Sequence, residues 1–180
     1  MSDGIPRVSI PVIDRIILHL WEQDHQADHY IVTSEVTRTG ISEVCAMHPP
    51  NVSRAMRELM SNGYVSEHSR SVRGEDRRQK TWQLTEDGRL EARQRIANLR
   101  TTTVLLRGKK GKLLEIRADE AAKKLETNLS LLQVLMHAHM REYSISVILD
   151  LVLLCRCPRG KNPLQTYFPV HILPIETSHL

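Results

Sequence analysis

The chain has 180 residues, of which 41% are hydrophobic and 26% are charged, the composition of an ordinary globular protein. Aromatic residues make up only 4%, so an aliphatic core and helices are favoured over a sandwich of aromatic-rich strands. The net charge of +4 suits a polyanionic partner if the basic residues cluster. The three cysteines lack the spacing of a disulfide framework, which favours a cytoplasmic protein over a secreted one.

No segment of the sequence predicts secretion or membrane insertion. The first eleven residues lack a basic stretch followed by an apolar run, the pattern of a signal peptide. The most apolar run, residues 145–155, is interrupted by Asp150 and is shorter than the roughly 20 residues that span a bilayer. We therefore expect no membrane partner.

The first predicted helix follows Pro11, a residue that suits the first turn of a helix. Apolar residues then recur with helical spacing at Val12, Ile13, Ile16, Ile17, Leu20 and Trp21. The polar stretch 24–29 ends this helix, and residues 30–33 predict a short strand. Within the polar stretch, Asp24, His25, Asp28 and His29 have an i, i+4 spacing that could ligate a metal. No distant Cys or His completes the set, so we interpret these residues as a polar helix end and predict no metal.

Two further helices and a turn are predicted between Ser34 and Gly63. Ser34 or Thr37 can cap the first helix, whose apolar face is supplied by Ile41, Val44 and Cys45. Residues 46–48 form the turn, and Pro49-Pro50 start a second helix over about residues 50–62. Its predicted core face consists of Val52, Ala55, Met56, Leu59 and Met60. Gly63 suits the left-handed conformation that follows a helix.

The next segment predicts a β-hairpin with a charged tip. Residues 64–72 form a short half-exposed strand, residues 73–79 a turn, and residues 80–85 the return strand. Thr85 can cap another helix, from Glu86 to about Arg100.

Beyond Thr101 the composition shifts. Residues 102–107 and 112–117 predict two strands around the turn 108–111. A later stripe of apolar residues has a period of about 3.6, the period of a straight helix, so it predicts one long helix or two helices broken near Ser144. The stripe consists of Leu125, Leu129, Leu132, Met136, Met140, Tyr143, Val147, Leu151 and Leu154. We expect these helices to mediate dimerisation, with packing inside the chain as the alternative. Residues 158–180 predict an irregular tail.

Several segments together resemble a known family. These are Thr37–Cys45, the following turn, Asn51–Leu59, Asn62–Val65, and residues 72–80 leading into Leu84, Thr85 and Gly88. They are similar to winged helix-turn-helix transcription regulators of the MarR-like type, in a form that also resembles archaeal winged-helix proteins. The resemblance covers about residues 12–100.

The resemblance and the predicted elements together imply a mainly α protein with a small β wing, an α+β fold. Residues 1–100 would form the winged helix-turn-helix, followed by a hairpin and C-terminal helices over residues 101–157 and the tail over residues 158–180.

The helix over residues 50–62 carries the predicted DNA-reading side chains. With its apolar face in the core, the helix must turn Asn51, Ser53, Arg54 and Arg57 outward. Asparagine can pair with adenine, arginine with guanine, and serine with base edges or phosphates. The predicted wing adds Arg73, Arg77, Arg78 and Lys80, which we expect on the backbone or in the minor groove of double-stranded DNA. Because one such module makes few base contacts, we also expect a homodimer.

A competing interpretation is a solvated charged surface. Residues 34–89 contain nine Lys or Arg and eight Asp or Glu, so the basic character is confined to one helix face and the wing. A protein-interaction or oligomerisation module, or the input domain of a larger assembly, is therefore the alternative function, since folds are reused.

Other residues give weaker signals. We interpret His137 and His139 as structural or surface residues, Cys155 and Cys157 as too closely spaced for a zinc half-site, and Cys45 as a core residue. No Gly-rich phosphate loop, nucleophile elbow or carboxylate pair predicts catalysis. We therefore expect neither an enzyme nor a cofactor, and the sequence identifies no effector.

Overall fold

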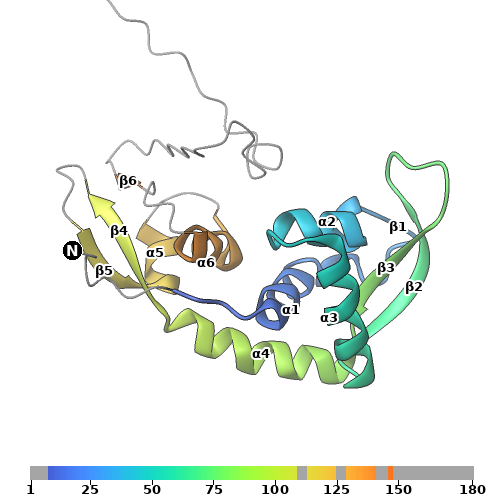
Figure 1. The fold of residues 1–180 in the computed structure, drawn as a ribbon, viewed down its shortest axis with the longest axis horizontal. Helices are drawn as coiled ribbons and strands as arrows, with labels where there is room; N and C mark the ends of the chain where they lie inside the picture. The colour runs from blue at the N-terminus through green and yellow to red at the C-terminus, as the bar shows by residue number, and fades with distance from the viewer. Residues whose placement is uncertain (1–7, 109–112, 125–128, 141–145, 148–180) are drawn as a thin grey trace, which may run out of the picture.

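The computed structural model describes residues 8–108, 113–124, 129–140 and 146–147, and it has a mixed α+β fold (Figure 1). The elements, in chain order, are α1 (Val12–Glu22), η1 (Asp24–Gln26), β1 (Ile31–Val32), η2 (Ser34–Val36), α2 (Arg38–Val44), α3 (Pro49–Ser61), β2 (Val65–Val72), β3 (Gln79–Leu84), α4 (Glu86–Arg100), β4 (Thr103–Gly108), β5 (Leu113–Arg117), α5 (Ala118–Lys124), α6 (Leu131–Met140) and β6 (Ser146–Val147). The predicted tail, residues 158–180, lies outside the described residues.

Helix α1 lies in the middle of the molecule, with α2 and α3 on one side and α5 and α6 on the other (Figure 1). It starts after Pro11, as predicted, and it buries Ile16, Ile17 and Leu20 almost completely. The helix ends at Glu22, and the polar stretch continues as a turn of 3-10 helix. An i, i+4 spacing in residues 24–29 therefore does not place side chains on one α-helical face.

The first sheet has the strand order β1-β2-β3. Strand β1 runs parallel to β2, and β2 pairs antiparallel with β3, with Val65 opposite Leu84 and Ser69 opposite Lys80. The hairpin prediction is confirmed, and the strand predicted over residues 30–33 is confirmed as the shorter Ile31–Val32. Val65, Trp82 and Leu84 are buried, so one face of the hairpin belongs to the core.

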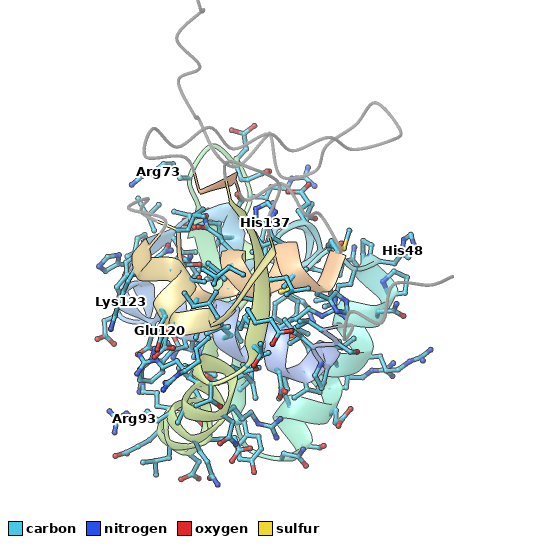
Figure 2. All side chains as sticks on the ribbon, turned by 90° about the vertical axis from the view of Figure 1, so that its left-hand side faces the viewer. His48, Arg73, Arg93, Glu120, Lys123 and His137 are labelled. Atoms are coloured by element: carbon cyan, nitrogen blue, oxygen red, sulfur yellow. The ribbon has the colours of Figure 1, made fainter. Side chains whose placement is uncertain are left out.

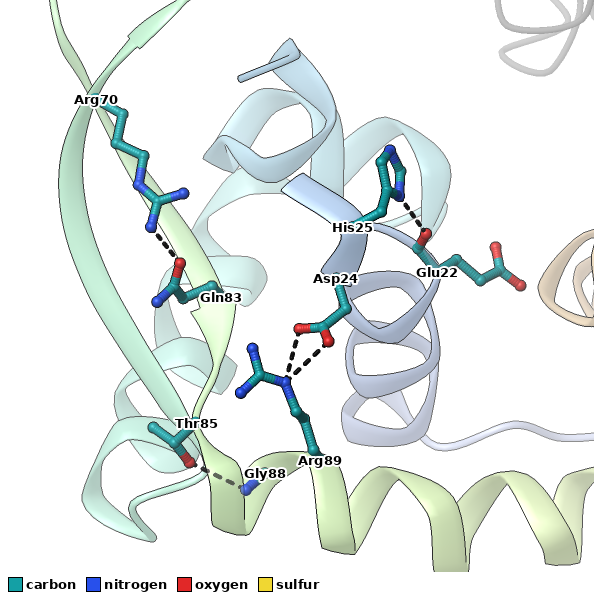
Figure 3. Close-up of polar contacts among 8 residues, drawn as sticks. All are labelled: Glu22, Asp24, His25, Arg70, Gln83, Thr85, Gly88 and Arg89. Carbon is teal, nitrogen blue, oxygen red and sulfur yellow. Dashed lines mark hydrogen bonds and ion pairs between the residues drawn. The ribbon is translucent and has the colours of Figure 1, made fainter. Parts of the chain in front are cut away.

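Helix α4 is tied to the hairpin and to α1. The Thr85 side chain caps it, because its Oγ1 accepts a hydrogen bond from the Gly88 amide at 3.0 Å (Figure 3). Gly88 lies against the Tyr64 carbonyl oxygen, where an added Cβ would come within 1.9 Å of that oxygen. Nε of Arg89 donates to both carboxylate oxygens of Asp24 at 2.9 and 3.1 Å, which fixes α4 to the segment after α1 (Figure 3).

The C-terminal elements differ from the predicted helical region. The hairpin β4–β5 is confirmed, and β6 pairs parallel with β4. The prediction of one long helix, or of a break near Ser144, is wrong: Leu129 and Ser130 are not helical, and Val147 lies in a strand. Ser130 and Gln133 explain the start of α6, because Ser130 Oγ accepts from the Gln133 amide while Gln133 Oε1 accepts from the Ser130 amide. The remaining residues of the stripe, Leu125, Tyr143, Leu151 and Leu154, lie outside the described residues.

One hydrophobic core connects both parts of the described chain. Leu132, Leu135 and Met136 of α6 are at most 2% exposed and belong to the same cluster as Ile16 and Ile17 of α1. The apolar face of α6 therefore packs inside the chain, which was the alternative to a dimer contact. Within the described ranges, no helix has the length and apolar character needed to cross a bilayer.

Candidate nucleic-acid interface

Helices α2 and α3 are joined by a short turn whose geometry is held by local hydrogen bonds. Thr37, rather than Ser34, caps α2, with its Oγ1 accepting from the Gly40 amide at 3.3 Å. In the turn, Ala46 has a left-handed backbone with φ of 48°. The Ser42 hydroxyl donates to the Met47 carbonyl at 2.5 Å, and the Met47 amide donates to the Ser42 carbonyl at 2.9 Å. The direction of α3 relative to α2 is thereby fixed.

A buried cation supports the same turn from α1. Arg15 is 8% exposed, and its Nη1 donates to the Cys45 carbonyl at 2.9 Å, at the C-terminal end of α2. A positive charge is favourable there because helix carbonyls gather negative charge at that end. Burial raises the pKa of the Cys45 thiol to about 12, so the thiol stays protonated. The interpretation of Cys45 as a core residue is confirmed, since it is fully buried.

Helix α3 has the two faces that the sequence predicts. It starts at Pro49, one residue earlier than expected, after His48 in an extended conformation. Val52, Ala55, Met56 and Leu59 are buried. On the opposite face, Asn51, Arg54 and Arg57 are exposed and Ser53 is partly exposed. These four residues form the α3 face.

The turn between β2 and β3 carries the other predicted cations. Arg73, Arg77, Arg78 and Lys80 are all exposed, and Arg73 lies at the edge of the molecule in Figure 2, away from His48 at the start of α3. Two of the four have protein partners. Nη2 of Arg78 donates to the Ser69 carbonyl at 2.6 Å, and Nζ of Lys80 lies 2.7 Å from Oε1 of Glu67. The cations at the tip, Arg73 and Arg77, thus extend to solvent.

A hollow separates α3 from the β2–β3 hairpin. It is lined by Arg38, Thr39, Ser53, Met56, Arg57, Met60, Glu67, Gln79, Lys80 and Trp82. The structure thus brings together Ser53 and Arg57 of α3 with Lys80 of β3. It also adds Arg38, an exposed residue at the start of α2 that was not among the residues predicted to contact DNA. The only sequence signal for Arg38 is its position directly after the capping Thr37, which does not reveal where α2 lies relative to α3.

The hairpin is fixed to the rest of the molecule by hydrogen bonds to two other segments. Thr37 forms an isolated antiparallel bridge with Thr81 of β3, which joins the start of α2 to the hairpin. Arg70 of β2 donates through Nη1 to the Gln26 carbonyl at 3.2 Å, and its Nη2 donates to Oε1 of Gln83 (Figure 3). The relative positions of α2, α3 and the hairpin are therefore set by specific contacts.

The remaining sequence candidates have other surroundings. Asp24 binds Arg89, and the His25 ring nitrogen Nδ1 lies 3.2 Å from the Glu22 carbonyl oxygen (Figure 3). Within the part of the chain that the structure describes, no three His, Cys, Asp or Glu side chains form a group that could hold a metal. His137 is buried and His139 is partly exposed. Cys155 and Cys157 lie outside the described residues.

Comparison with known proteins gives no family for this chain: no protein-family model matches it, and no curated protein matches it.

Proposed function

We propose that the protein is a sequence-specific, double-stranded DNA-binding regulator of transcription with a winged helix-turn-helix of the MarR-like type. In this proposal α2, the turn and α3 form the helix-turn-helix, and β2 with β3 forms the wing. The α3 face enters the major groove, where Asn51, Arg54 and Arg57 read base edges and Ser53 contacts bases or phosphates. The protein binds DNA without a catalytic step, and we place it in the cytoplasm.

The observation that carries the proposal is the hollow between α3 and the hairpin. Three cations from three different elements line it: Arg38 of α2, Arg57 of α3 and Lys80 of β3. Arg54 on α3 and the cations at the tip of the hairpin are exposed on two of the same elements. Positive charge on separate elements suits a phosphate backbone, which supplies most of the affinity of DNA-binding proteins.

One carboxylate, that of Glu67, lies within the same hollow and is paired with Lys80. Lys80 is 72% exposed, so the pair costs little to break when a phosphate replaces the carboxylate. The neighbouring wing cations Arg73, Arg77 and Arg78 then contact the backbone or the minor groove.

A homodimer belongs to the same proposal. Two copies bound to a two-fold operator double the number of base contacts, which one module alone lacks. The buried side chains of α6 pack inside the chain, so the contact between copies must use other residues than Leu132, Leu135 and Met136.

Fluorescence anisotropy with a random DNA duplex tests the proposal. With about four phosphate contacts, we expect affinity to fall roughly 100-fold between about 50 and 200 mM salt, because bound counterions are released on binding. Absence of binding at the lower salt concentration would contradict the proposal.

One observation favours a protein-interaction module as the second candidate. Tyr30 and Ile31, at the edge strand β1, are 74% and 55% exposed. Apolar side chains beside an unpaired strand edge are a common place for another chain to bind. If the protein does not bind DNA at low salt, this candidate takes precedence.

A further inference from the structure

A small cavity lies between α1, η2, α2 and α6, away from the proposed DNA-binding surface. Its volume is about 80 Å³, and it is lined by His19, Glu22, Gln23, Glu35, Glu43, Val44, Leu132, Gln133, Met136 and His137. His19, Leu132, Met136 and His137 are buried, whereas Gln23 and Gln133 are partly exposed and Glu43 is exposed. The cavity thus has a closed floor and an accessible rim. Among the residues that the structure describes, no Lys or Arg lines the cavity.

His19 contributes an unpaired hydrogen-bond acceptor. Its Nε2 lies 2.9 Å from the Glu35 carbonyl oxygen, and because a carbonyl only accepts, Nε2 must carry the hydrogen. Burial lowers the pKa of His19, so near neutral pH the ring carries that one hydrogen and Nδ1 keeps a lone pair. His19 is 1% exposed, and Nδ1 has no hydrogen-bond partner. A buried acceptor without a donor is unfavourable.

Glu22 contributes a second acceptor beside the same cavity. One of its oxygens, Oε1, accepts a hydrogen bond from the Leu132 amide at 3.2 Å. The Glu22 side chain points away from the Asp24–Arg89 ion pair (Figure 3). Burial raises the pKa of Glu22, although hydrogen bonds from the Leu132 amide and the Ser130 side chain favour its charged form. Glu35 adds another carboxylate, of which Oε2 accepts a hydrogen bond from the Thr33 hydroxyl at 3.1 Å.

We propose that this cavity is a binding site for a small organic cation that donates N–H groups, of the guanidinium or alkylammonium class. The lining offers an imidazole lone pair and the carboxylates of Glu22 and Glu35, which all accept hydrogen bonds, and no Lys or Arg of the described part of the chain lines the cavity. The described residues lack a three-ligand metal group, which favours an organic cation over a metal ion. Val44, Leu132 and Met136 supply an apolar wall for the carbon atoms. The site is independent of the proposed DNA binding.

The size of the cavity limits the ligand. Cavities of about 150 Å³ in protein cores accept benzene, which has six heavy atoms, so about 80 Å³ holds roughly three heavy atoms and the accessible rim takes the rest of a small head group. Methylguanidinium, with five heavy atoms, is a suitable probe. Its small size implies a dissociation constant on the order of 1 mM.

The test is a nuclear magnetic resonance titration of the 15N-labelled full chain with methylguanidinium chloride. Methylurea serves as the neutral analogue of similar shape, and sodium acetate serves as the anion, at matched ionic strength. We expect saturable shifts of the Leu132 amide, which donates to Glu22, and of the His19 Nδ1 resonance, which gains a donor. Methylurea and acetate should leave both resonances unchanged.

Two variants and one control locate the site. We expect Glu22→Gln to weaken methylguanidinium binding roughly tenfold or more, because a charge-assisted hydrogen bond is lost. Glu35→Gln should weaken it several-fold, and it serves as the test if Glu22→Gln does not fold. Glu120→Gln, an exposed carboxylate on α5 (Figure 2), should have no effect.

Three results would overturn the proposal. The first is no shift of either resonance up to about 50 mM methylguanidinium, many times the expected constant, which would mean that water alone fills the cavity. The second is equal binding of methylurea, which would remove the requirement for charge. The third is binding that neither the Glu22 nor the Glu35 variant weakens.

Discussion

Single side chains on the proposed interface have different surroundings, and these surroundings separate their expected roles. Arg54 is exposed on α3, with Ala55 and Met56 of the same helix in the core. Arg77 is exposed in the turn between β2 and β3. Arg78 bonds to Ser69 and Lys80 pairs with Glu67. Arg54 and Arg77 are therefore the best pair for comparing base reading with phosphate binding.

We expect Arg54→Ala and Arg77→Ala to weaken DNA binding in different ways. The first should reduce the free energy of binding to the preferred sequence by about 1–3 kcal/mol, because a base contact is lost, and should change binding to random duplexes little. The second should weaken binding to all duplexes alike, because one phosphate contact is lost. It should also reduce the slope of log affinity against log salt concentration by about one. Anisotropy with a selected and a random duplex at several salt concentrations measures both effects. Equal, sequence-independent losses would remove α3 as the reading helix.

The buried His19 makes stability depend on pH. Because burial lowers the pKa of His19, the unfolded chain takes up a proton below about pH 6.5 that the folded protein does not. We expect the free energy of unfolding to fall as pH decreases below about 6.5, by up to about 1.4 kcal/mol per pH unit. Burial raises the pKa of Glu22, which acts with the opposite sign at pH values between its unfolded and its folded pKa.

Urea denaturation of the wild type and of His19→Gln at several pH values isolates the histidine term, since Glu22 is present in both proteins. We expect the variant to lose the decrease in stability between about pH 6.5 and 5. Replacement of the exposed His29 by Gln is the matched control and should leave the pH profile unchanged. An unchanged profile in His19→Gln would contradict a buried, neutral His19.

At the scale of elements, the junction between the hairpin and α4 depends on a close backbone approach. Gly88 lies against the Tyr64 carbonyl, and the Thr85 amide donates to that same oxygen at 3.0 Å. Thr85 also links the junction to the end of α3, since its hydroxyl donates to the Gly63 carbonyl at 2.6 Å. The position of the hairpin relative to α3 therefore depends on this junction.

We expect Gly88→Ala to destabilise the protein by about 3 kcal/mol, near the upper end of typical overpacking costs, because the new Cβ collides with the Tyr64 carbonyl. Gly63→Ala is the comparison: Gly63 has a positive φ of 74° and open space around it, so only backbone strain of about 1 kcal/mol is expected. Urea denaturation measures the loss of stability in both variants. A cost of Gly88→Ala no larger than that of Gly63→Ala would contradict the close approach.

At the scale of the whole molecule, the C-terminal elements share one core with the N-terminal ones. Helix α6 packs on α1, and Ile10 before α1 donates its amide to Nδ1 of His139 at 3.3 Å. The apolar side chains of α6 that the sequence suggested for dimerisation are thus used within the chain. A dimer contact must involve surface that remains exposed in the single chain.

We predict a homodimer at tens of micromolar protein, a rough working range for such assemblies. Analytical ultracentrifugation should then give twice the 20.7 kDa mass of one chain. Binding of two copies to one two-fold duplex, measured in the same experiment, is the expected companion result. A monomer throughout this range would rule out the dimer and leave the DNA-binding proposal to the anisotropy measurement.

Elements with local sequence signals were predicted correctly. Helical periodicity and Pro49-Pro50 located α3 to within one residue, and Thr85 located the start of α4. The outward positions of Asn51, Arg54 and Arg57 followed from the same periodicity, because a helix with one buried face exposes the other. Periodicity failed after Ala118, since it ignored the hydrogen bonds between Ser130 and Gln133 that start a new helix.

Contacts between side chains that are distant in sequence could not be predicted from local patterns. The entry of Arg38 into the hollow depends on the angle between α2 and α3, which no local pattern specifies. The pairing of Lys80 with Glu67 depends on strand register, because these residues lie diagonally across β2 and β3 on one face. The cavity around His19 depends on how α6 packs against α1 and α2. Contacts between distant segments arise from packing and register, which a local reading of the sequence does not contain.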